Sequence, residues 1–220
     1  MSGDAAKLDS PMVVRWLGRI SYQEALAAQE AIVATKMQDP LAPDEFLLLE
    51  HEPVYTMGRT PDQSSLRDIG QLPFAVVHTN RGGQATYHGP GQLVGYPLLD
   101  LNRYGRDLHR HLRVIEEALI ATVRTYGVQA ESREGLTGVW VDQRKIASIG
   151  VGVRRWISMH GFALNVCGDL APFSEITPCG IAGVEMTSLS RECGREIDVR
   201  EVGDVVAGHL QAALDMCRKL

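Results

Sequence analysis

Residues 81–97 read RGGQATYHGPGQLVGYP, and this stretch decides how the middle of the chain is arranged. Glycine occupies positions 82, 83, 89, 91 and 95 within it. Such a density lets the backbone run against a ligand with no side chain in the way. The apolar residues that follow, up to position 101, are typical of a buried strand. The segment therefore predicts a glycine-rich binding wall that leads directly into a sheet.

A second short segment, residues 178–180, reads Pro-Cys-Gly and presents a thiol on a turn. A free cysteine has a pKa of about 8.5, so a nucleophilic one needs a nearby cation or base. The positions of Cys167 and Cys217, at the end of an apolar strand and in the last helix, predict structural roles, and Cys193 lies in a charged, superficial stretch. Cys179 is the candidate nucleophile, and with residues 81–97 it predicts an acyl-binding site served by a thiol.

The composition is typical of a soluble globular protein. The chain has 220 residues, of which 45% are hydrophobic and 22% are charged. This length is enough to bury a core without disulfide or metal staples. The net charge is −5, so the chain lacks the basic footprint of a general nucleic-acid binder, and we expect no nucleic-acid partner.

Targeting, membrane and metal signals are missing from the sequence. Residues 1–11 are short and polar, unlike a secretory signal, and no stretch approaches the roughly 18 apolar residues that span a bilayer. We therefore expect a cytoplasmic protein with reduced thiols and no membrane partner. The cysteine spacings fit no paired zinc pattern, and His78, His88 and His160 lack the spacing of a zinc site. No metal is expected.

Helices and strands follow one another in a mixed order. The sequence Ser21-Tyr22-Gln23-Glu24 is a capping box that starts one helix, Asp107 caps a second that ends before Gly127, and Asp198 caps the last. The continuous apolar run 46–49 predicts a central strand. Other strands are expected over residues 13–17 with Gly18 as the end, 54–57, 74–77, 92–101, 139–141, 145–153 and 156–166.

This order predicts an α+β fold, a single domain whose mixed β-sheet is flanked by helices. We expect residues 1–12 to be a disordered tail and residues 13–220 to form one catalytic domain.

The residues alone leave several side chains with two interpretations. Lys145 precedes a run of apolar and small residues, where desolvation would make it a usable base, yet a solvent-exposed turn lysine explains it better when it is considered by itself. The Arg81-Gly82-Gly83 turn can form an anion-binding nest, but it matches neither the Walker nor the Rossmann pattern. His88 and His160 can line a substrate pocket or satisfy a hydrogen bond in the core.

Several longer motifs, in the same order along the chain, resemble the lipoyl(octanoyl) transferase family (octanoyl-[acyl-carrier-protein]:protein N-octanoyltransferase). The resemblance covers nearly the whole chain, from about residue 13 to 215. The motifs are LEHEPVYTMGR at 49–59, residues 81–92 with GYP at 95–97, GVWV at 138–141 with KIASIG at 145–150, HGFALNV at 160–166, and residues 173–180 with TSL at 187–189.

The resemblance implies the fold of the biotin/lipoate protein ligase catalytic domain. It implies transfer of an octanoyl group from octanoyl-acyl carrier protein to a lysine of a lipoyl domain, in endogenous lipoate biosynthesis. The implied acceptors are the lipoyl domains of 2-oxoacid dehydrogenase complexes and the glycine cleavage H protein. Because the donor thioester is already activated, no cofactor is expected.

The resemblance also assigns roles to residues. The acyl group would pass through a thioester on Cys179, with Lys145 as its partner in a cysteine–lysine dyad. The ammonium of Lys145 would favour the thiolate, and the backbone N–H of Gly180 or of residues 148–150 would stabilise the oxyanion. We expect Tyr87 and Leu164 to line the acyl slot. Substrate-contacting positions map onto Arg81, Gly82, Gly83, Gln84, Ala85, Thr86, Tyr87, His88, Ser148, Ile149, Gly150, Gly161, Phe162 and Ala163.

Two other functions compete with this interpretation. An ATP-dependent lipoate- or biotin-protein ligase of the same fold would activate a free acid and would not need a nucleophilic cysteine, so the Pro-Cys-Gly-Ile run at 178–181 argues against it. A non-catalytic module that binds acyl carrier protein would keep the pocket but would be indifferent to loss of the thiol. In either case Arg154 and Arg155 could dock an acidic carrier protein or form a solvated turn.

Overall fold

The computed structural model describes residues 11–60, 64–66, 69–180 and 183–218. The main sheet consists of β1 (Val13–Ile20), β2 (Glu45–His51), β6 (Gln92–Leu98), β7 (Glu131–Arg133), β8 (Leu136–Val141), β9 (Arg144–Arg154), β10 (Ile157–Asn165) and β11 (Glu185–Met186). A small sheet consists of β3 (Val54–Met57), β4 (Val76–His78) and β5 (Thr86–His88). The helices are α2 (Tyr22–Gln38), α3 (Leu108–Thr125), α4 (Leu189–Cys193) and α5 (Val199–Arg218), and short 3-10 turns occupy Ile69–Gln71, Leu101–Tyr104, Ala171–Glu175 and Pro178–Gly180.

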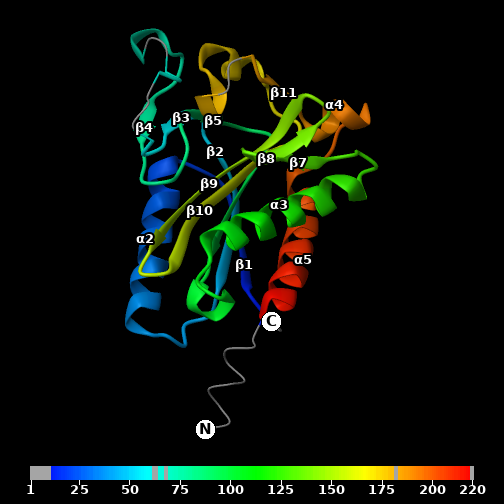
Figure 1. Ribbon diagram of the computed structural model, residues 1–220. Helices are drawn as coiled ribbons and strands as arrows, with labels where there is room; N and C mark the ends of the chain where they lie inside the picture. Colours follow the sequence, from blue (N-terminus) through cyan, green and yellow to red (C-terminus); the bar gives the residue numbers. More distant parts are fainter. Residues whose placement is uncertain (1–10, 61–63, 67–68, 181–182, 219–220) are drawn as a thin grey trace.

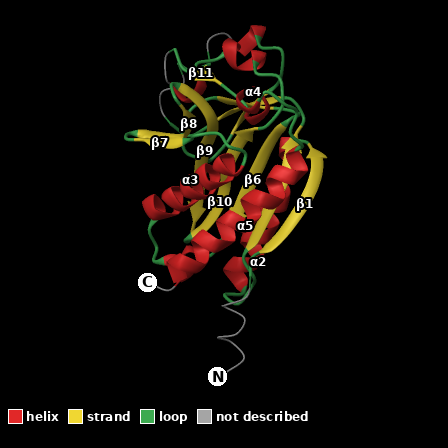
Figure 2. Cartoon of the chain, turned by 90° about the vertical axis from the view of Figure 1, so that its right-hand side faces the viewer, coloured by secondary structure: helices red, strands yellow, loops and turns green. Residues whose placement is uncertain are grey.

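The main sheet is mixed and has helices on both faces. Its strands follow the order β1-β2-β6-β10-β9-β8-β7, with β11 paired to β9. The β1–β2 and β11–β9 pairs are parallel, and the other pairs are antiparallel. Helix α2 lies on one face, and α3 and α5 lie together on the other (Figures 1 and 2). The predicted α+β architecture with a mixed, helix-flanked sheet is confirmed.

Strand β2 is an interior strand covered on both faces, as its continuous apolar run predicted, although it lies next to the edge strand β1 and not in the middle of the sheet. Phe46 and Leu48 pack into the cluster that contains the apolar sides of α3 and α5. Leu47 and Leu49 point the other way, into the cluster beneath α2. Alternate residues of a strand face opposite sides of a sheet, so a strand covered on both faces is apolar throughout.

The predicted helix caps are present. The Ser21 side chain accepts a hydrogen bond from the Glu24 N–H, and the Glu24 carboxylate accepts one from the Ser21 N–H at 3.0 Å. The Asp107 carboxylate accepts from the N–H of Arg110 at 3.1 Å. Gly127, just beyond the end of α3, has a φ of +81°. These local signals set the start of α2 and both ends of α3.

The first strand departs from the prediction in two ways. Gly18 does not end β1; it has a φ of +71° within the strand, where the register with β2 shifts between Trp16 and Arg19. A glycine in a strand often marks such a bulge. Met12, expected in a disordered tail, is buried in the main core, and its N–H donates to Gln211 Oε1 at 2.8 Å. The tail prediction is therefore wrong at this residue, and residues 1–10 lie outside the described part of the chain.

Other element boundaries also moved. Strand β4 begins at Val76, because Phe74 turns into the aromatic cluster with Tyr55 and Tyr87. Strand β9 begins at Arg144, one residue before the expected strand 145–153, so the turn after β8 is shorter than the expected strand ends imply, and Asp142 in this turn has a positive φ. Three short strands, β5, β7 and β11, carry too few residues for a recognisable pattern and were not predicted.

The small sheet lies at one end of the main sheet and brings distant segments together. Its cluster of Tyr55, Met57 and Tyr87 packs against Phe173 and Ile176 from the loop after β10. Figure 1 shows β3, β4 and β5 beside this loop at the top of the molecule. None of the described helices combines the length and apolar character needed to cross a membrane.

The capping box of α2 gives a stability prediction. Ser21→Ala removes the side-chain acceptor for the Glu24 N–H, and we expect the free energy of unfolding to fall by about 1 kcal/mol. Urea denaturation followed by circular dichroism measures this change. Thr35→Ala is the control, since the Thr35 hydroxyl only donates back to the Ala31 carbonyl on an exposed side of the same helix. Equal losses in the two variants would contradict the capping interpretation.

Candidate active site

Glycines allow the 81–84 loop to lie directly on the main sheet. Gly161 of β10 is paired with Gly150 of β9, and a Cβ at Gly161 would sit 2.2 Å from the Gly95 carbonyl oxygen. A Cβ at Gly150 would sit 2.9 Å from the Gly82 carbonyl oxygen. The Gly82 N–H donates to the Val151 carbonyl at 2.9 Å. The backbone of the loop and of three strands thus forms a wall with few side chains, as the glycine density predicted.

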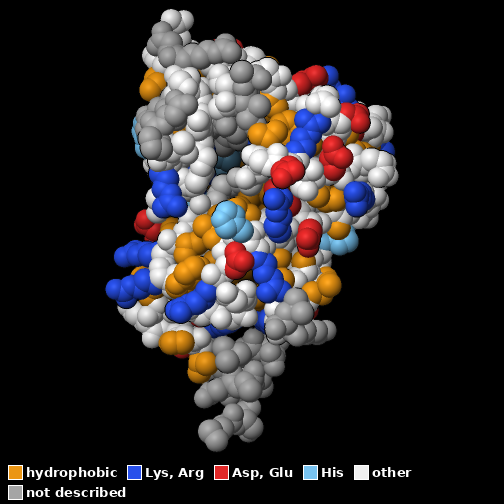
Figure 3. Space-filling view, in the orientation of Figure 1, with side chains coloured by type: hydrophobic (Ala, Val, Ile, Leu, Met, Phe, Trp, Pro, Cys, Tyr) orange, Lys and Arg blue, Asp and Glu red, His pale blue; other side chains and the backbone are white. Residues whose placement is uncertain are grey.

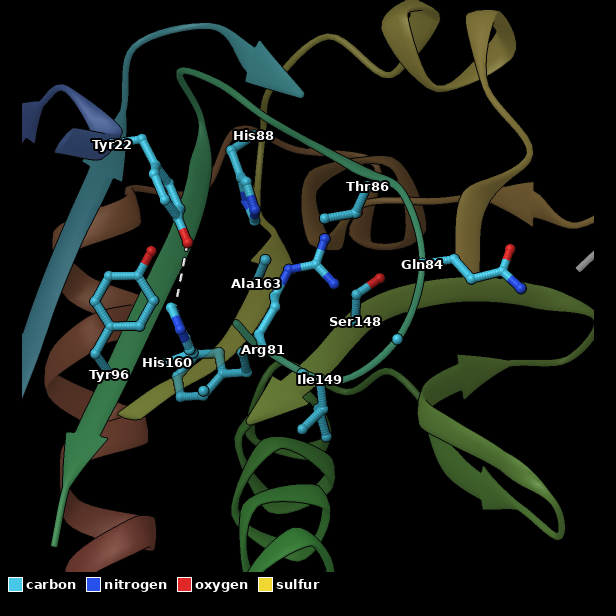
Figure 4. Close-up of a pocket in the computed structure, with 14 residues that line it drawn as sticks. Tyr22, Arg81, Gln84, Thr86, His88, Tyr96, Ser148, Ile149, His160 and Ala163 are labelled. Carbon is cyan, nitrogen blue, oxygen red and sulfur yellow. Dashed lines mark hydrogen bonds between the residues drawn. The ribbon is translucent and has the colours of Figure 1, made fainter. Parts of the chain in front are cut away.

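A narrow cavity of about 40 Å³ opens at this wall (Figure 4). Its lining residues are Tyr22, Arg81, Gly83, Gln84, Thr86, His88, Tyr96, Ser148, Ile149, Gly150, His160, Gly161, Phe162 and Ala163. Most of the positions expected to contact substrate are therefore brought together here. No carboxylate is among these lining residues.

Some expected lining residues lie elsewhere. Gly82 faces a neighbouring cavity. Ala85 is fully buried, and its N–H donates to Ser65 Oγ at 3.1 Å. Tyr87 packs edge-on against Phe173, with ring centroids 5.5 Å apart, and Leu164 lies in the main core. The prediction that Tyr87 and Leu164 line the acyl slot is wrong, because both side chains are used in packing.

Arg81 ties the loop to the small sheet and brings a cation to the cavity. It is 8% exposed, and Nη2 donates to the carbonyl oxygen of Thr56 at 2.7 Å and to its hydroxyl at 2.8 Å. Nη1 donates to the Gly82 carbonyl at 2.9 Å. Figure 4 shows the guanidinium group reaching between Thr86 and Ser148. The same side chain therefore holds the loop and sets the charge of the cavity.

A buried network of histidines and tyrosines backs the cavity. Tyr22 OH lies 3.4 Å from His160 Nδ1, drawn as the dashed line in Figure 4. The other ring nitrogen of His160 is hydrogen-bonded to Asn80. His51 Nε2 is 2.7 Å from Tyr96 OH, and Tyr96 also lines the cavity. These bonds satisfy polar groups that would otherwise be costly to bury.

His88 occupies a similar position on the other side of this network. Its Nδ1 lies 2.8 Å from Gln92 Oε1, and its Nε2 lies 3.1 Å from the Thr56 hydroxyl. Gln92 donates in turn to Asn165 Oδ1 at 2.9 Å. His88 and His160 both line the cavity and both take part in buried hydrogen bonds. The two interpretations that the sequence left open, a pocket-lining position and a hydrogen bond in the core, therefore both apply.

These histidines are held in the neutral form. Burial lowers the pKa of His51 and of His160 to about 4, and the Arg81 cation adds to the effect at His160. Burial, His51 and Arg81 lower the pKa of His88 well below its usual value. At neutral pH, Arg81 is therefore the cation among the residues that line this cavity.

Lys145 lies at the start of β9 and is almost completely buried. Its side chain is 1% exposed, so the interpretation as a solvent-exposed turn lysine is wrong. Nζ donates to the Thr137 carbonyl at 3.0 Å and lies 5.3 Å from the centroid of the Trp140 ring. Gly138 leaves room for it, because a Cβ there would be 2.7 Å from Lys145 Cε. Lys145 is among the residues that line a second cavity, of about 380 Å³, which shares Gly83, Ile149 and Gly150 with the first.

The Pro178–Gly180 turn approaches the mouth of the first cavity. A Cβ at Gly180 would lie 2.2 Å from Gln84 Oε1, and Gln84 lines the cavity. The Thr177 N–H donates to the Ser65 carbonyl, and the Gly180 N–H donates to the Thr177 carbonyl at 3.0 Å. The Gly180 N–H is therefore engaged within the turn, which argues against its expected role as an oxyanion donor. The structure describes the backbone of Cys179; its side chain lies outside the described part.

The other cysteines lie away from this site. Cys167 is exposed rather than structural, because the chain leaves the sheet at Asn165. Cys193 is partly buried against the main core, with its thiol 3.5 Å from the Tyr126 carbonyl, so its expected superficial position is wrong. Cys217, in the last helix, packs against the same core as expected.

Several residues of the network were missed from the sequence. Tyr22 was assigned only to a helix start, and Thr56, Asn80 and Tyr96 were assigned no role at all. One available signal was the presence of polar side chains inside otherwise apolar strands, such as His51 at the end of β2. Within the described residues, no three His, Cys, Asp or Glu side chains cluster in a way that could hold a metal ion.

A family model described as the lipoyl protein ligase A/B catalytic domain matches residues 21–211. The chain belongs to this family. It is 51% identical over 204 residues to the octanoyltransferase of Geobacter metallireducens, with 93% of this chain and 94% of the relative covered. It is 55% identical over 191 residues to the octanoyltransferase of Geobacter sulfurreducens, covering 87% and 80% of the two chains.

Solved structures show the same fold at low sequence identity. A lipoate-protein ligase A bound with ATP superposes with a TM-score of 0.76 at 16% identity, covering 94% of this chain and 86% of that one. A biotin protein ligase from Aquifex aeolicus in complex with biotin and ATP gives 0.61 at 13% identity, covering 94% and 72%. The fold expected from the motifs of this lipoyl protein ligase A/B family member is confirmed.

The buried neutral histidines make stability depend on pH. Burial lowers the pKa of His111, on α3, to about 4, so the unfolded state binds more protons between pH 4 and 6.5. The free energy of unfolding should fall as the pH drops through this window, by up to about 1.4 kcal/mol per pH unit for each such histidine.

His111→Leu tests this dependence, since His111 Nε2 has no hydrogen-bond partner among the described residues and an apolar side chain suits the site. Urea titrations at pH 4.5, 5.5 and 6.5 give the free energy of unfolding at each pH. This free energy should change less with pH in the variant than in the wild type. His209→Gln is the control, because it removes a histidine that is only partly buried. The same pH dependence of the free energy of unfolding in the wild type and in His111→Leu would show that the pKa of His111 is not lowered in the folded state.

Proposed function

We propose that this protein transfers an octanoyl group from octanoyl-acyl carrier protein to a lysine of a lipoyl domain, through a thioester on Cys179. The family and the octanoyltransferases at about half sequence identity support octanoyl transfer. One structural observation carries the detail. Buried Lys145 faces a cavity that adjoins the glycine-lined cavity, at whose mouth the Pro178–Gly180 turn packs on Gln84.

The reaction proceeds in two acyl transfers. Lys145 Nζ takes the proton of the Cys179 thiol, and the thiolate attacks the donor's thioester carbonyl. The carrier sulfur leaves and receives that proton, so one thioester replaces another. The acceptor amine then attacks the Cys179 thioester, an amide forms, and the thiol is regenerated. Formation of the amide makes the second step favourable.

The first cavity receives the acyl chain. At about 40 Å³ it has space for one or a few water molecules, so an octanoyl chain enters only when lining side chains move aside. Ile149 is partly exposed and separates this cavity from its larger neighbour, and Phe162 and Ala163 supply apolar surface beside it. A wall of glycine backbone cannot move aside, so it sets the direction of the chain.

The first prediction concerns formation of the acyl-enzyme. After the protein is mixed with octanoyl-acyl carrier protein and no ATP, intact-protein mass spectrometry should show a gain of one octanoyl group (about 126 Da), as expected for nucleophilic catalysis. Hydroxylamine should remove it, and Cys179→Ala should not acquire it. Modification of a lipoyl domain that requires ATP and free octanoate, with no adduct from the donor, would instead support a ligase.

Lys145→Met tests the proposed base while preserving the apolar stem of the side chain. We expect the rate of Cys179 acylation to fall by about 10²- to 10⁴-fold, the usual contribution of a general base. Arg144→Gln is the matched control, because its guanidinium pairs with Glu192 at 2.9 Å. Its rate should stay within a few-fold of the wild type. Thermal melts confirm that each variant folds, and an unchanged rate in Lys145→Met would exclude this role.

A further inference from the structure

The two ends of the acyl cavity are chemically different. Gln84 lies at the end that the Pro178–Gly180 turn approaches. Tyr22, Tyr96 and His160 line the cavity as well, and Figure 4 shows them on the side away from Gln84. We call these three residues the tyrosine–histidine end. An acyl chain held as a thioester on the turn would start at Gln84, so its methyl group would point towards the tyrosine–histidine end.

The tyrosine–histidine end is closed. Its residues Tyr22, Tyr96 and His160 are 3%, 4% and 1% exposed. Fully buried His51 packs behind the two tyrosines, with ring centroids 5.2 Å from Tyr22 and 6.0 Å from Tyr96. The outer surface in Figure 3, by contrast, mixes charged side chains of both signs with apolar ones. A chain that reaches this end therefore meets buried aromatic rings and not solvent.

His160 has an unusual backbone conformation for a residue in a strand. Its φ is +56°, although it lies within β10 and pairs with Val151 of β9. The pairing of β10 with β6 covers residues 162–165 and does not reach His160. A left-handed backbone is uncommon outside glycine, and irregularities in a strand often re-aim a side chain next to a site. Here the ring of His160 faces the acyl cavity.

Helix α2 holds His160 at two points. Tyr22 OH lies 3.4 Å from Nδ1 of the ring, and the His160 N–H donates to Gln29 Oε1 at 2.7 Å. Positions 22 and 29 are two helical turns apart, so both side chains project from the same face of α2. Asn80 is hydrogen-bonded to the other ring nitrogen. The ring and the backbone of His160 are therefore both fixed by groups outside β10.

The contact between Gln29 and His160 carries two costs. Gln29 is completely buried, and its Nε2 has no hydrogen-bond partner among the described residues. An unpartnered buried amide and a left-handed residue other than glycine each cost stability. Leucine at position 29 would avoid the first cost, but it would leave the His160 N–H without its acceptor. Such costs at one contact point to a functional reason for keeping it.

We propose that the Tyr22–His160 pair is the stop that limits the acyl chain to octanoyl, and that Gln29 is a positioning residue that holds this stop in place. The inference rests on the proposed function. Partly exposed Ile149 can move aside to admit the chain, whereas Tyr22 and His160 are buried and held by hydrogen bonds. A longer chain would have to displace a buried aromatic ring.

The test compares octanoyl- and decanoyl-acyl carrier protein as donors. Intact-protein mass spectrometry follows acylation of Cys179 and gives a second-order rate constant for each donor. His160→Gly suits the left-handed backbone and removes the ring. The decanoyl-to-octanoyl ratio of the rate constants should then rise about tenfold or more, as expected for the value of a methylene in a fitted pocket.

Gln29→Leu should raise the same ratio by several-fold, because His160 is then free to shift. Val33→Ala is the matched control on α2, since Val33 packs against Ile157 and Met159 of β10. It loosens the same helix on the same strand without removing the acceptor of the His160 N–H, so the ratio should stay at the wild-type value. A Gln29→Leu variant that slows both donors equally would make Gln29 merely structural and overturn its role.

A double variant tests whether Gln29 acts through His160. Adding Gln29→Leu to His160→Gly should leave the ratio where His160→Gly alone put it, because coupled residues do not have additive effects. A further rise in the double variant would overturn the positioning role. A wild-type ratio in His160→Gly would overturn the stop itself.

The wild type alone decides the matter where thermal melts show that the variants do not fold. Its acylation should be about tenfold or more slower with decanoyl- than with octanoyl-acyl carrier protein, and equal rates would overturn the stop. Wild type that neither donor acylates would overturn the proposed function, whereas normal octanoyl transfer with unchanged ratios would overturn this inference alone.

Discussion

The close approach of glycine backbones is the constraint on which the site depends. Gly58, Gly150 and Gly161 each have another backbone oxygen where a Cβ would be, at 2.1 to 2.9 Å. Only glycine permits these contacts. They hold the 81–84 loop against β9 and let β10 lie close to β6, so the binding wall is made of the backbone of the sheet.

The polar groups around this wall are either positively charged or neutral. Arg81 is bound to the backbone of β3 and of its own loop, and the buried histidines nearby remain neutral. Lys145 is separately buried and lines the neighbouring cavity of about 380 Å³. In the proposed mechanism, a thioester carbonyl that enters here would meet cationic and neutral groups, because no carboxylate is among the described residues that line the first cavity.

Much of the fold could be predicted because its signals are local. The Ser21 capping box, the Asp107 cap and the apolar run of β2 each depend on a few neighbouring residues. The predictions failed at positions whose structure depends on residues far away in the sequence. Met12 is ordered by Gln211 at the other end of the chain, and Gly18 continues a strand because its parallel partner β2 extends past it.

For the site, the sequence by itself determined which residue types are available and where glycine is required. The motifs therefore predicted Cys179, Lys145 and substrate-contacting positions in the segments 81–88, 148–150 and 161–163, and the structure brings most of those substrate-contacting positions to one cavity. Tertiary structure alone decided which side chains face the cavity. It turned Tyr87 into the core, buried Lys145 beside Trp140 and brought Tyr22 and Tyr96 to the histidines. The reason is physical: exposure and hydrogen bonding depend on contacts between residues far apart in the chain, and no local pattern contains them.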